Sequence, residues 1–289
     1  MSSDTDIVIR SESCTRCGDC ARVCPMHIFV RLPDNAPIQT ARPETCFGCG
    51  HCVSVCPADA IRHPLFPSGK VHPVDYASYP SPEQLMLLMK ARRSNRVFTD
   101  QPIPQAMLSQ ILEAAHRAPT ASNLQEIAFT LITDPAKLKL VTEFSIGVFD
   151  RFAKRLDTPI LKTILLRMNP DARRYAPLFR RIAELYARGN DMILRKATAL
   201  ILIHAPADNR FGGADANLAY QNASLMAESL HVAHFYTGLV VSAAAQARGK
   251  LENQLGIRGT LHAGMALGMS DLRYPNFMDR KDISVSFML

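Results

Sequence analysis

Eight cysteines in two runs of identical spacing constrain this chain more than any other feature. Each run reads C-x2-C-x2-C-x3-C and is followed directly by a proline. The first run consists of Cys14, Cys17, Cys20 and Cys24, before Pro25. The second run consists of Cys46, Cys49, Cys52 and Cys56, before Pro57. No cysteine occurs elsewhere in the 289 residues, so the thiol chemistry is confined to the N-terminal part of the chain.

Thiols at this spacing could form disulfides, bind zinc or bind iron–sulfur clusters. A disulfide framework is typical of small secreted domains, whereas this segment opens a long chain whose polar start, Met1 to Asp6, does not resemble a signal peptide. Zinc sites generally use two C-x2-C pairs, and here every run has a third and a fourth cysteine. The spacing therefore favours iron–sulfur clusters.

The double run resembles that of bacterial ferredoxins that carry two [4Fe-4S] clusters. In that arrangement the first three cysteines of a run bind one cluster, and the fourth binds the other. The resemblance implies two ligand sets: Cys14, Cys17, Cys20 and Cys56; and Cys46, Cys49, Cys52 and Cys24. His51 lies inside the second run. We expect His51 to tune the reduction potential of that cluster by hydrogen bonding.

Prolines are concentrated between residues 64 and 82, a composition that cannot sustain a helix and indicates a linker. We therefore expect three parts: a two-cluster ferredoxin-like domain over 1–63, a proline-rich linker over 64–82, and a second domain over 83–289.

Charge is distributed unevenly between these parts. Residues 1–80 carry 7 Lys+Arg and 8 Asp+Glu, a net charge of −1, while the remaining residues carry a net charge of +8. The chain has no nucleic-acid recognition motif, so we expect no nucleic-acid partner and attribute the basic charge to an anionic phosphate cofactor or to a solvated surface. No apolar run approaches the ~20 residues of a membrane helix. Reduced thiols suit a cytoplasmic location.

Hydrophobic periodicity predicts strands separated by long helices, which favours the α+β class over a doubly wound sheet. The predicted helices cover 83–93, 104–118, 135–144, 215–235 and 238–254, with two or three more in 150–196. The predicted strands cover 127–133, 198–204, 260–267 and 283–288. His204 would be an ordinary core residue. His231 and His234 would lie on one helix, at the spacing of a metal pair but without an evident third ligand.

Three polar segments are candidates for a cofactor site. The first ends a helix and consists of Arg92, Arg93, Ser94, Asn95 and Arg96, a set that suits a phosphate group but also a solvated helix end. The second holds Thr120, Asn123 and Gln125, which could bond a ring edge or simply form a capped turn. The third is Arg280–Lys281, where the alternative is surface charge.

Together these segments resemble the nitroreductase family of FMN-dependent oxidoreductases over residues 83–289. The matching order is R-R-S-x-R, then P-[ST]-x-x-N-x-Q, then a helix with Gln221 and Asn222, then Gly238. Leu267–Gly268 and Arg280–Lys281 complete the series. The whole chain is thus similar to a ferredoxin–nitroreductase fusion. The chain departs from the family in lacking tryptophan and in having Glu126 and Ile127 after the loop, so Phe235 or Tyr236 would replace the ring near the flavin.

The resemblance implies a central, mostly antiparallel sheet flanked by helices, with FMN as cofactor. Arg92, Arg93, Ser94 and Arg96 would hold its ribityl and phosphate oxygens, joined by Arg280 and Lys281. Thr120, Asn123 and Gln125 would line the flavin, near Gly238. Family members are usually homodimers with flavin at the interface, and the segment Ile283–Met288 would cross to the partner.

Three functions fit these residues. In the first, an external donor such as reduced ferredoxin or flavodoxin feeds the clusters, and FMN reduces a small electron-poor acceptor: a nitroaromatic, a quinone or an activated alkene. No side chain need act as a covalent catalyst. In the second, NAD(P)H reduces the flavin and the clusters are the exit. In the third, the chain is a redox sensor or carrier. The basic segment 150–196 is then either a docking surface or, as we prefer, a cover over the site.

Overall fold

The computed structural model describes residues 7–31, 36–157, 167 and 172–288. Contacts divide the chain into two compact units. The first comprises residues up to Tyr79 together with Ala121–Leu124, and the second comprises Pro80–Thr120 and Gln125–Leu289. Among the described residues, no helix has both the length and the apolar character needed to cross a bilayer.

The first unit is built from very short elements. Two helices, α1 (Asp19–Val23) and α2 (His51–Val55), each contain the third cysteine of a run and begin directly after a glycine. Two antiparallel pairs complete the unit: β1 (Val8–Ile9) with β4 (Ile61–Arg62), and β2 (Phe29–Val30) with β3 (Gln39–Thr40). The proline-rich segment contains two 3-10 turns, Ser68–Lys70 and Tyr76–Ser78. That composition excludes longer helices, because proline lacks the donor that a helix interior needs.

The second unit is a four-stranded antiparallel sheet covered by helices, as expected for an α+β fold. Its strand order is β5-β6-β8-β7. The strands are β5 (Ala128–Ile132), β6 (Ala199–Ala205), β7 (Ala233–Tyr236) and β8 (Thr260–Gly268). The helices are α3 (Pro82–Ala91), α4 (Gln105–His116), α5 (Pro135–Asp157), α7 (Ala172–Ala187), α8 (Gly212–Ser229), α9 (Gly238–Ala247) and α10 (Lys250–Leu255).

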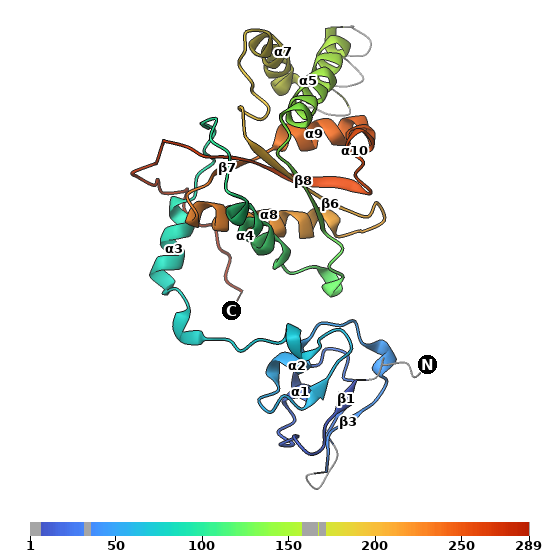
Figure 1. Cartoon of the computed structure of the whole chain (residues 1–289). Helices are drawn as coiled ribbons and strands as arrows, with labels where there is room; N and C mark the ends of the chain where they lie inside the picture. The colour runs from blue at the N-terminus through green and yellow to red at the C-terminus, as the bar shows by residue number, and fades with distance from the viewer. Residues whose placement is uncertain (1–6, 32–35, 158–166, 168–171, 289) are drawn as a thin grey trace. The chain divides into compact units, whose positions relative to one another are not determined.

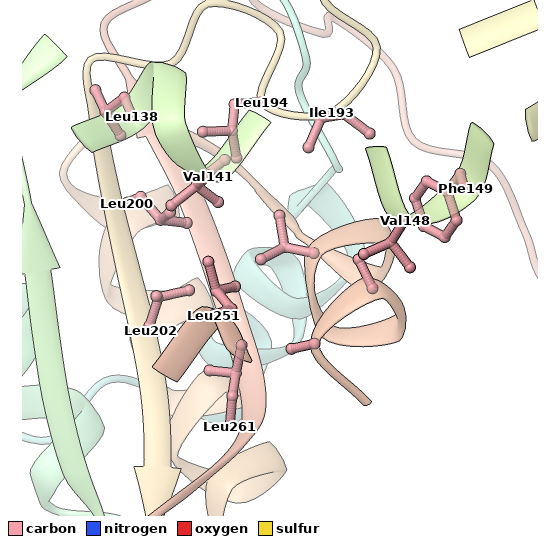
Figure 2. Close-up of a cluster of buried hydrophobic side chains, with 14 of the residues drawn as sticks. Leu138, Val141, Val148, Phe149, Ile193, Leu194, Leu200, Leu202, Leu251 and Leu261 are labelled. Atoms are coloured by element: carbon pink, nitrogen blue, oxygen red, sulfur yellow. The ribbon is translucent and has the colours of Figure 1, made fainter. Parts of the chain in front are cut away.

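Strand β6 explains how the sheet divides the core. All seven of its residues are buried, because helices cover both faces of the sheet. Leu200 and Leu202 point into one apolar cluster, with Val141 and Leu251 (Figure 2), while Ile201 and Ile203 belong to the other. Figure 1 shows α4 and α8 on one side of the sheet and α5, α9 and α10 on the other.

The predicted helix over 215–235 is wrong at its C-terminal end. Helix α8 stops at Ser229, and β7 begins at Ala233. His231 adopts a left-handed φ of 57° in the turn between them, and the Val232 amide bonds back to the Ala227 carbonyl at 2.8 Å. His231 and His234 therefore do not share a helix, and the metal pair suggested by their spacing does not form.

The C-terminal strand predicted over Ile283–Met288 is also not formed. A strand needs a hydrogen-bonded neighbour, and no described residue of this chain pairs with the segment. Its side chains are strongly exposed, as the 87% exposure of Ile283 and the 98% exposure of Met288 illustrate.

Other predicted boundaries differ from the structure by shorter distances. The helix predicted over 238–254 is broken into α9 and α10 at Arg248 and Gly249, whose φ values of 34° and 75° are not helical. The helix predicted over 135–144 continues to Asp157. Of the helices predicted within 150–196, the end of α5 and α7 are described, and residues 158–166 and 168–171 lie outside the described residues.

Candidate functional site

The eight thiols of the first unit form two groups of neighbours. Burial raises the pKa of Cys20, the backbone N–H of Ala21 opposes it, and the charges of Cys17, Cys14 and Cys56 raise it further. Burial is also the main cause that raises the pKa of Cys52 to about 11. The charges of Cys49, Cys46 and Cys24 raise the pKa of Cys52 further. Each group combines three cysteines of one run with the fourth of the other.

Backbone amides donate hydrogen bonds to several of these sulfurs. The Sγ atoms of Cys24, Cys46 and Cys56 accept from the N–H groups of Ile28, Gly48 and Ala60, at 3.5, 3.4 and 3.2 Å. Such donors favour the thiolate form that iron requires. Among the described residues, no three His, Cys, Asp or Glu side chains are arranged to hold one metal ion. Each group of four thiols matches the four cysteine ligands of a [4Fe-4S] cluster.

Glycines before α1 and α2 shape both cysteine loops in the same way. Gly18 and Gly50 occupy matched positions in the two runs, with φ values of 81° and 76°. Only glycine adopts this conformation without steric cost, and it lets the chain reverse between the second and third cysteines.

A histidine that the sequence interpretation missed contacts one of the thiols. The Nε2 atom of His63 lies 3.5 Å from Cys46 Sγ, and the imidazole is 6% exposed. Burial lowers the pKa of His63. His51, which the spacing suggested instead, is exposed, and its side chain makes no hydrogen bond or ion pair within the described part of the chain. The signal that could have identified His63 is its place two residues after Ile61, which in an extended segment puts its side chain on the same face as that buried residue.

In the second unit, the arginine segment that follows α3 is fixed by Asn95. This side chain is buried, and its Nδ2 donates to Ser270 Oγ at 3.2 Å and to the Leu272 carbonyl at 3.3 Å. Its Oδ1 accepts from the Val97 amide at 3.0 Å. The asparagine of R-R-S-N-R thus ties this turn to the segment after β8, and leaves the neighbouring arginines to face a cavity.

That cavity, of about 800 Å3, brings together two of the three predicted polar segments. Five predicted residues line it: Arg92, Arg93, Ser94, Arg96 and Arg280. Lys281 does not line it, whereas Asp279 does. Among the described residues, none of these arginines has a carboxylate within ion-pair distance. Unneutralised guanidinium groups around one cavity are suited to a phosphate.

A second cavity, of about 730 Å3, shares Arg96 with the first. It is mainly apolar and is lined by Tyr236, Thr237 and Gly238 at the start of α9. Thr237 Oγ1 is buried and finds no hydrogen-bond partner among the residues that the structure describes, none of which caps the helix with its side chain. A buried hydroxyl rarely stays unpaired in a native protein, so a polar ring edge bound here would satisfy it. Arg96 also lies over the Phe235 ring, 5.3 Å from its centroid.

Two tyrosines link the arginine segment to this cavity. The rings of Tyr220 and Tyr236 meet edge to face at 4.8 Å. Burial raises the pKa of Tyr220 to about 12, although Arg92 and Arg96 oppose the rise. The hydroxyl therefore stays protonated near the arginines and can donate a hydrogen bond. Both rings proposed to replace tryptophan, Phe235 and Tyr236, line the cavity, and Phe235 is also packed into the core with 5% exposure.

The remaining predicted segment, the loop 120–125, lines neither cavity. Ser122, Asn123 and Gln125 all have left-handed φ values, between 51° and 53°. Left-handed conformations of residues other than glycine occur mainly at functional sites, where the surrounding structure enforces them. Within the second unit, Thr120 Oγ1 accepts from the Gln125 amide at 3.0 Å. Within the first unit, Asn123 Nδ2 donates to the Gly48 carbonyl at 2.8 Å.

Comparison with known families matches both parts of the chain. A model of the nitroreductase family matches residues 89–269, and a model of the 4Fe-4S dicluster domain matches residues 13–61. A curated NADH dehydrogenase from Thermus thermophilus is 43% identical over 56 residues, which cover 19% of this chain and 27% of that protein. The chain thus matches about a quarter of the length of this relative.

Three solved structures share the fold of the second unit. A nitroreductase with bound FMN from Bacteroides fragilis is 20% identical with a TM-score of 0.52, over 71% of this chain and 99% of that one. A nitroreductase with bound FMN from Desulfitobacterium hafniense is 17% identical with a TM-score of 0.52, over 70% and 98%. An FMN-dependent nitroreductase from Clostridium difficile is 18% identical with a TM-score of 0.51, over 72% and 100%.

At these identities the structures show a common fold alone. The family model, however, covers more than half of the chain. The chain therefore belongs to the nitroreductase family, as an oxidoreductase that carries a 4Fe-4S dicluster domain.

Proposed function

We propose that this protein is an FMN-dependent oxidoreductase that receives electrons through two [4Fe-4S] clusters and reduces a small electron-poor acceptor, such as a nitroaromatic, a quinone or an activated alkene. The observation that carries the proposal is the cavity in which Arg92, Arg93 and Arg96 meet Arg280, with none of the four ion-paired to a carboxylate of the described residues. A flavin phosphate would neutralise this charge. FMN supplies the interchange between one-electron and two-electron transfer that links clusters to such acceptors.

The chain's own residues have the following roles in this proposal. Arg92, Arg93, Ser94, Arg96 and Arg280 bind the phosphate and ribityl oxygens, with Lys281 as a further cation outside the cavity lining. Thr237 and the uncapped amides that begin at Gly238 offer polar contacts to the ring system in the apolar cavity.

The ligand sets proposed for the clusters are those of the ferredoxin pattern. Each set contains a buried or half-buried thiol that is sensitive to the charges of its three companions. One cluster takes Cys14, Cys17, Cys20 and Cys56. The other takes Cys46, Cys49, Cys52 and Cys24.

We also propose that the protein acts as a homodimer. Thr120, Asn123 and Gln125 line neither flavin cavity of their own chain, so a second copy would be needed to bring this loop to the flavin. The exposed segment Ile283–Met288 would then find its missing neighbour on the partner. Sedimentation velocity measures whether the flavin-loaded protein is a dimer. The Arg280→Ala variant, which lacks one of the proposed flavin contacts, is the comparison.

Flavin binding is tested first. Arg280→Ala should weaken FMN binding by about 10- to 100-fold, because a hydrogen bond to a charged group contributes ~1.5–3 kcal/mol. Arg188→Ala is the matched control, since Arg188 is exposed and lines neither cavity. Fluorescence titration of the flavin measures both affinities. Equal affinity in the two variants would contradict the phosphate site.

A second candidate function differs in the electron donor. The matching segment of a protein named NADH dehydrogenase favours direct reduction by NADH, with the clusters as the exit. Anaerobic stopped-flow separates the two. If reduced ferredoxin bleaches the clusters before the flavin, electrons enter the protein through the clusters. If NADH bleaches the flavin before the clusters are reduced, electrons leave through the clusters.

A further inference from the structure

Backbone and ring contacts with Phe66 position His63 within the first unit. It follows β4 directly, and forms a bridge with Phe66, whose amide donates to the His63 carbonyl at 3.0 Å. The two rings contact each other with centroids 4.9 Å apart. These contacts turn the Nε2 atom of the imidazole toward Cys46.

The hydrogen-bond pattern fixes which nitrogen of His63 carries the proton. The backbone N–H of Leu65 donates to Nδ1 at 3.2 Å. A nitrogen that accepts a hydrogen bond has a free lone pair, so the proton of the neutral ring is on Nε2. Nε2 is the atom 3.5 Å from Cys46 Sγ. His63 is therefore a donor to this sulfur, and the backbone of Leu65 determines that role.

A donor to a ligand sulfur changes the energy of reduction. Reduction adds negative charge that is shared with the thiolates, and an N–H group pointing at one of them stabilises that charge. The Gly48 amide already donates to Cys46 at 3.4 Å, so this sulfur has two donors. The oxidised state gains less from the same bonds, because its sulfurs carry less charge.

The internal repeat supplies a comparison within the same molecule. The second cysteine run lies 32 residues after the first, so Cys14 corresponds to Cys46, and Arg31 corresponds to His63. In the described part of the chain, Cys14 Sγ accepts no hydrogen bond of this kind, and the Arg31 side chain lies against Gly18 instead. The environments of the two ligand sets are therefore unequal.

We propose that His63, by donating from Nε2 to Cys46, raises the reduction potential of the cluster on Cys46, Cys49, Cys52 and Cys24 above that of the other cluster. An electron entering the first unit then collects on this cluster. The proposal makes His63 a positioning residue for electron transfer, and it rests on the cluster ligation proposed above.

The test is an anaerobic redox titration of the full-length, cluster-loaded protein, followed by electron paramagnetic resonance. His63→Phe keeps the ring contact with Phe66 but removes the donor. It should lower the potential of one cluster and leave the other unchanged. We expect about a tenfold change in its reduction equilibrium, which is about 59 mV for one electron. His63→Gln, whose amide can reach the same sulfur, should restore most of the shift. His51→Phe should change neither potential.

A spectroscopic measurement keeps the proposal testable if His63→Phe fails to hold iron. The sample is the unmodified protein with 15N-labelled histidine, reduced so that the clusters are paramagnetic. Its hyperfine spectra should show that one cluster is coupled to an exchangeable proton and, weakly, to a nitrogen. The His51→Phe variant should retain both couplings. The proposal would be overturned if the cluster-loaded protein lacked these couplings. It would also be overturned if both reduction potentials were unchanged in His63→Phe. Wild-type protein without iron and sulfide would instead contradict the proposed cluster function itself.

Discussion

The two units of this chain are stabilised by different means. The first has helices of five residues and strands of two, and its core contains eight buried side chains among the described residues, of which Cys24 and Cys52 are two. The second has a nine-residue strand, β8, and apolar clusters on both faces of its sheet. The contrast teaches that the fold of the first unit depends on the iron–sulfur clusters that it binds. The fold of the second unit is stabilised by its own apolar core and does not depend on the site that it carries.

Removal of the clusters is the strongest way to test this contrast. After oxidation and chelation, we expect the first unit to unfold, because its core is too small to offset the entropy of ordering the chain without metal. Hydrogen exchange followed by mass spectrometry should show fast exchange at Phe29, Val53 and Ile61. Peptides from β6 serve as the internal control and should stay protected. Persistent protection of the first unit would remove the distinction between the units.

A cavity in the core of the second unit should have the opposite effect. Leu202 is fully buried in β6, and Leu202→Ala should cost about 2–5 kcal/mol of unfolding free energy in that unit. Leu218→Ala is the matched control, since Leu218 is 47% exposed on α8. Denaturant unfolding measures the loss, while iron content reports on the first unit. A loss of iron in Leu202→Ala but not in Leu218→Ala would show that the units are not independent.

Acid should destabilise the second unit by a smaller amount through His234. Its side chain is fully buried, and Nδ1 donates to the Val232 carbonyl at 3.1 Å, while Nε2 has no hydrogen-bond partner in the described part of the chain. Burial, with a contribution from Arg92, lowers its pKa to about 4. The unfolded chain takes up this proton near pH 6.5 and the folded chain only near pH 4, so stability is full above 6.5 and falls below it. The expected loss is at most about 3 kcal/mol, at 1.36 kcal/mol per pH unit.

The comparison for that experiment is His234→Gln, which removes the titrating group. Unfolding free energies of both proteins, measured from pH 7 to pH 4 through exchange in β7 and β8, should diverge across this range. Parallel curves would assign the acid sensitivity to other groups, such as His204 and His262, whose pKa values are also lowered by burial.

The contrast between the units also explains what could be predicted from the sequence. Cysteine spacing is a local signal, and the 4Fe-4S dicluster assignment followed from it. The α+β class and the family likewise followed from segment order. The contact of His63 with Cys46 could not be predicted, because it joins residues 17 apart through a turn whose hydrogen bonds are not visible in the pattern. His51 was preferred only because it is adjacent in sequence.

Two errors in the second unit have a common physical cause. Strand β7 follows α8 after a turn made by Leu230, His231 and Val232, with neither glycine nor proline to mark it. The apolar side chains on both sides continue a helical period, so tertiary pairing with β8 overrides the local signal. The segment Ile283–Met288 has the alternation of a strand. Alternation predicts only that a segment could pair, and no strand among the described residues pairs with this one.

The left-handed residues of the loop 120–125 have a consequence for how this protein would change under selection. Ser122 and Gln125 hold a backbone that costs a side-chain-bearing residue roughly 1–2 kcal/mol. In a library screened for heat resistance alone, glycine at these two positions should be recovered early. In a library screened for flavin retention, the same replacements should be depleted if the polar side chains contribute to binding. The two enrichment profiles would separate the residues kept for folding from those kept for chemistry.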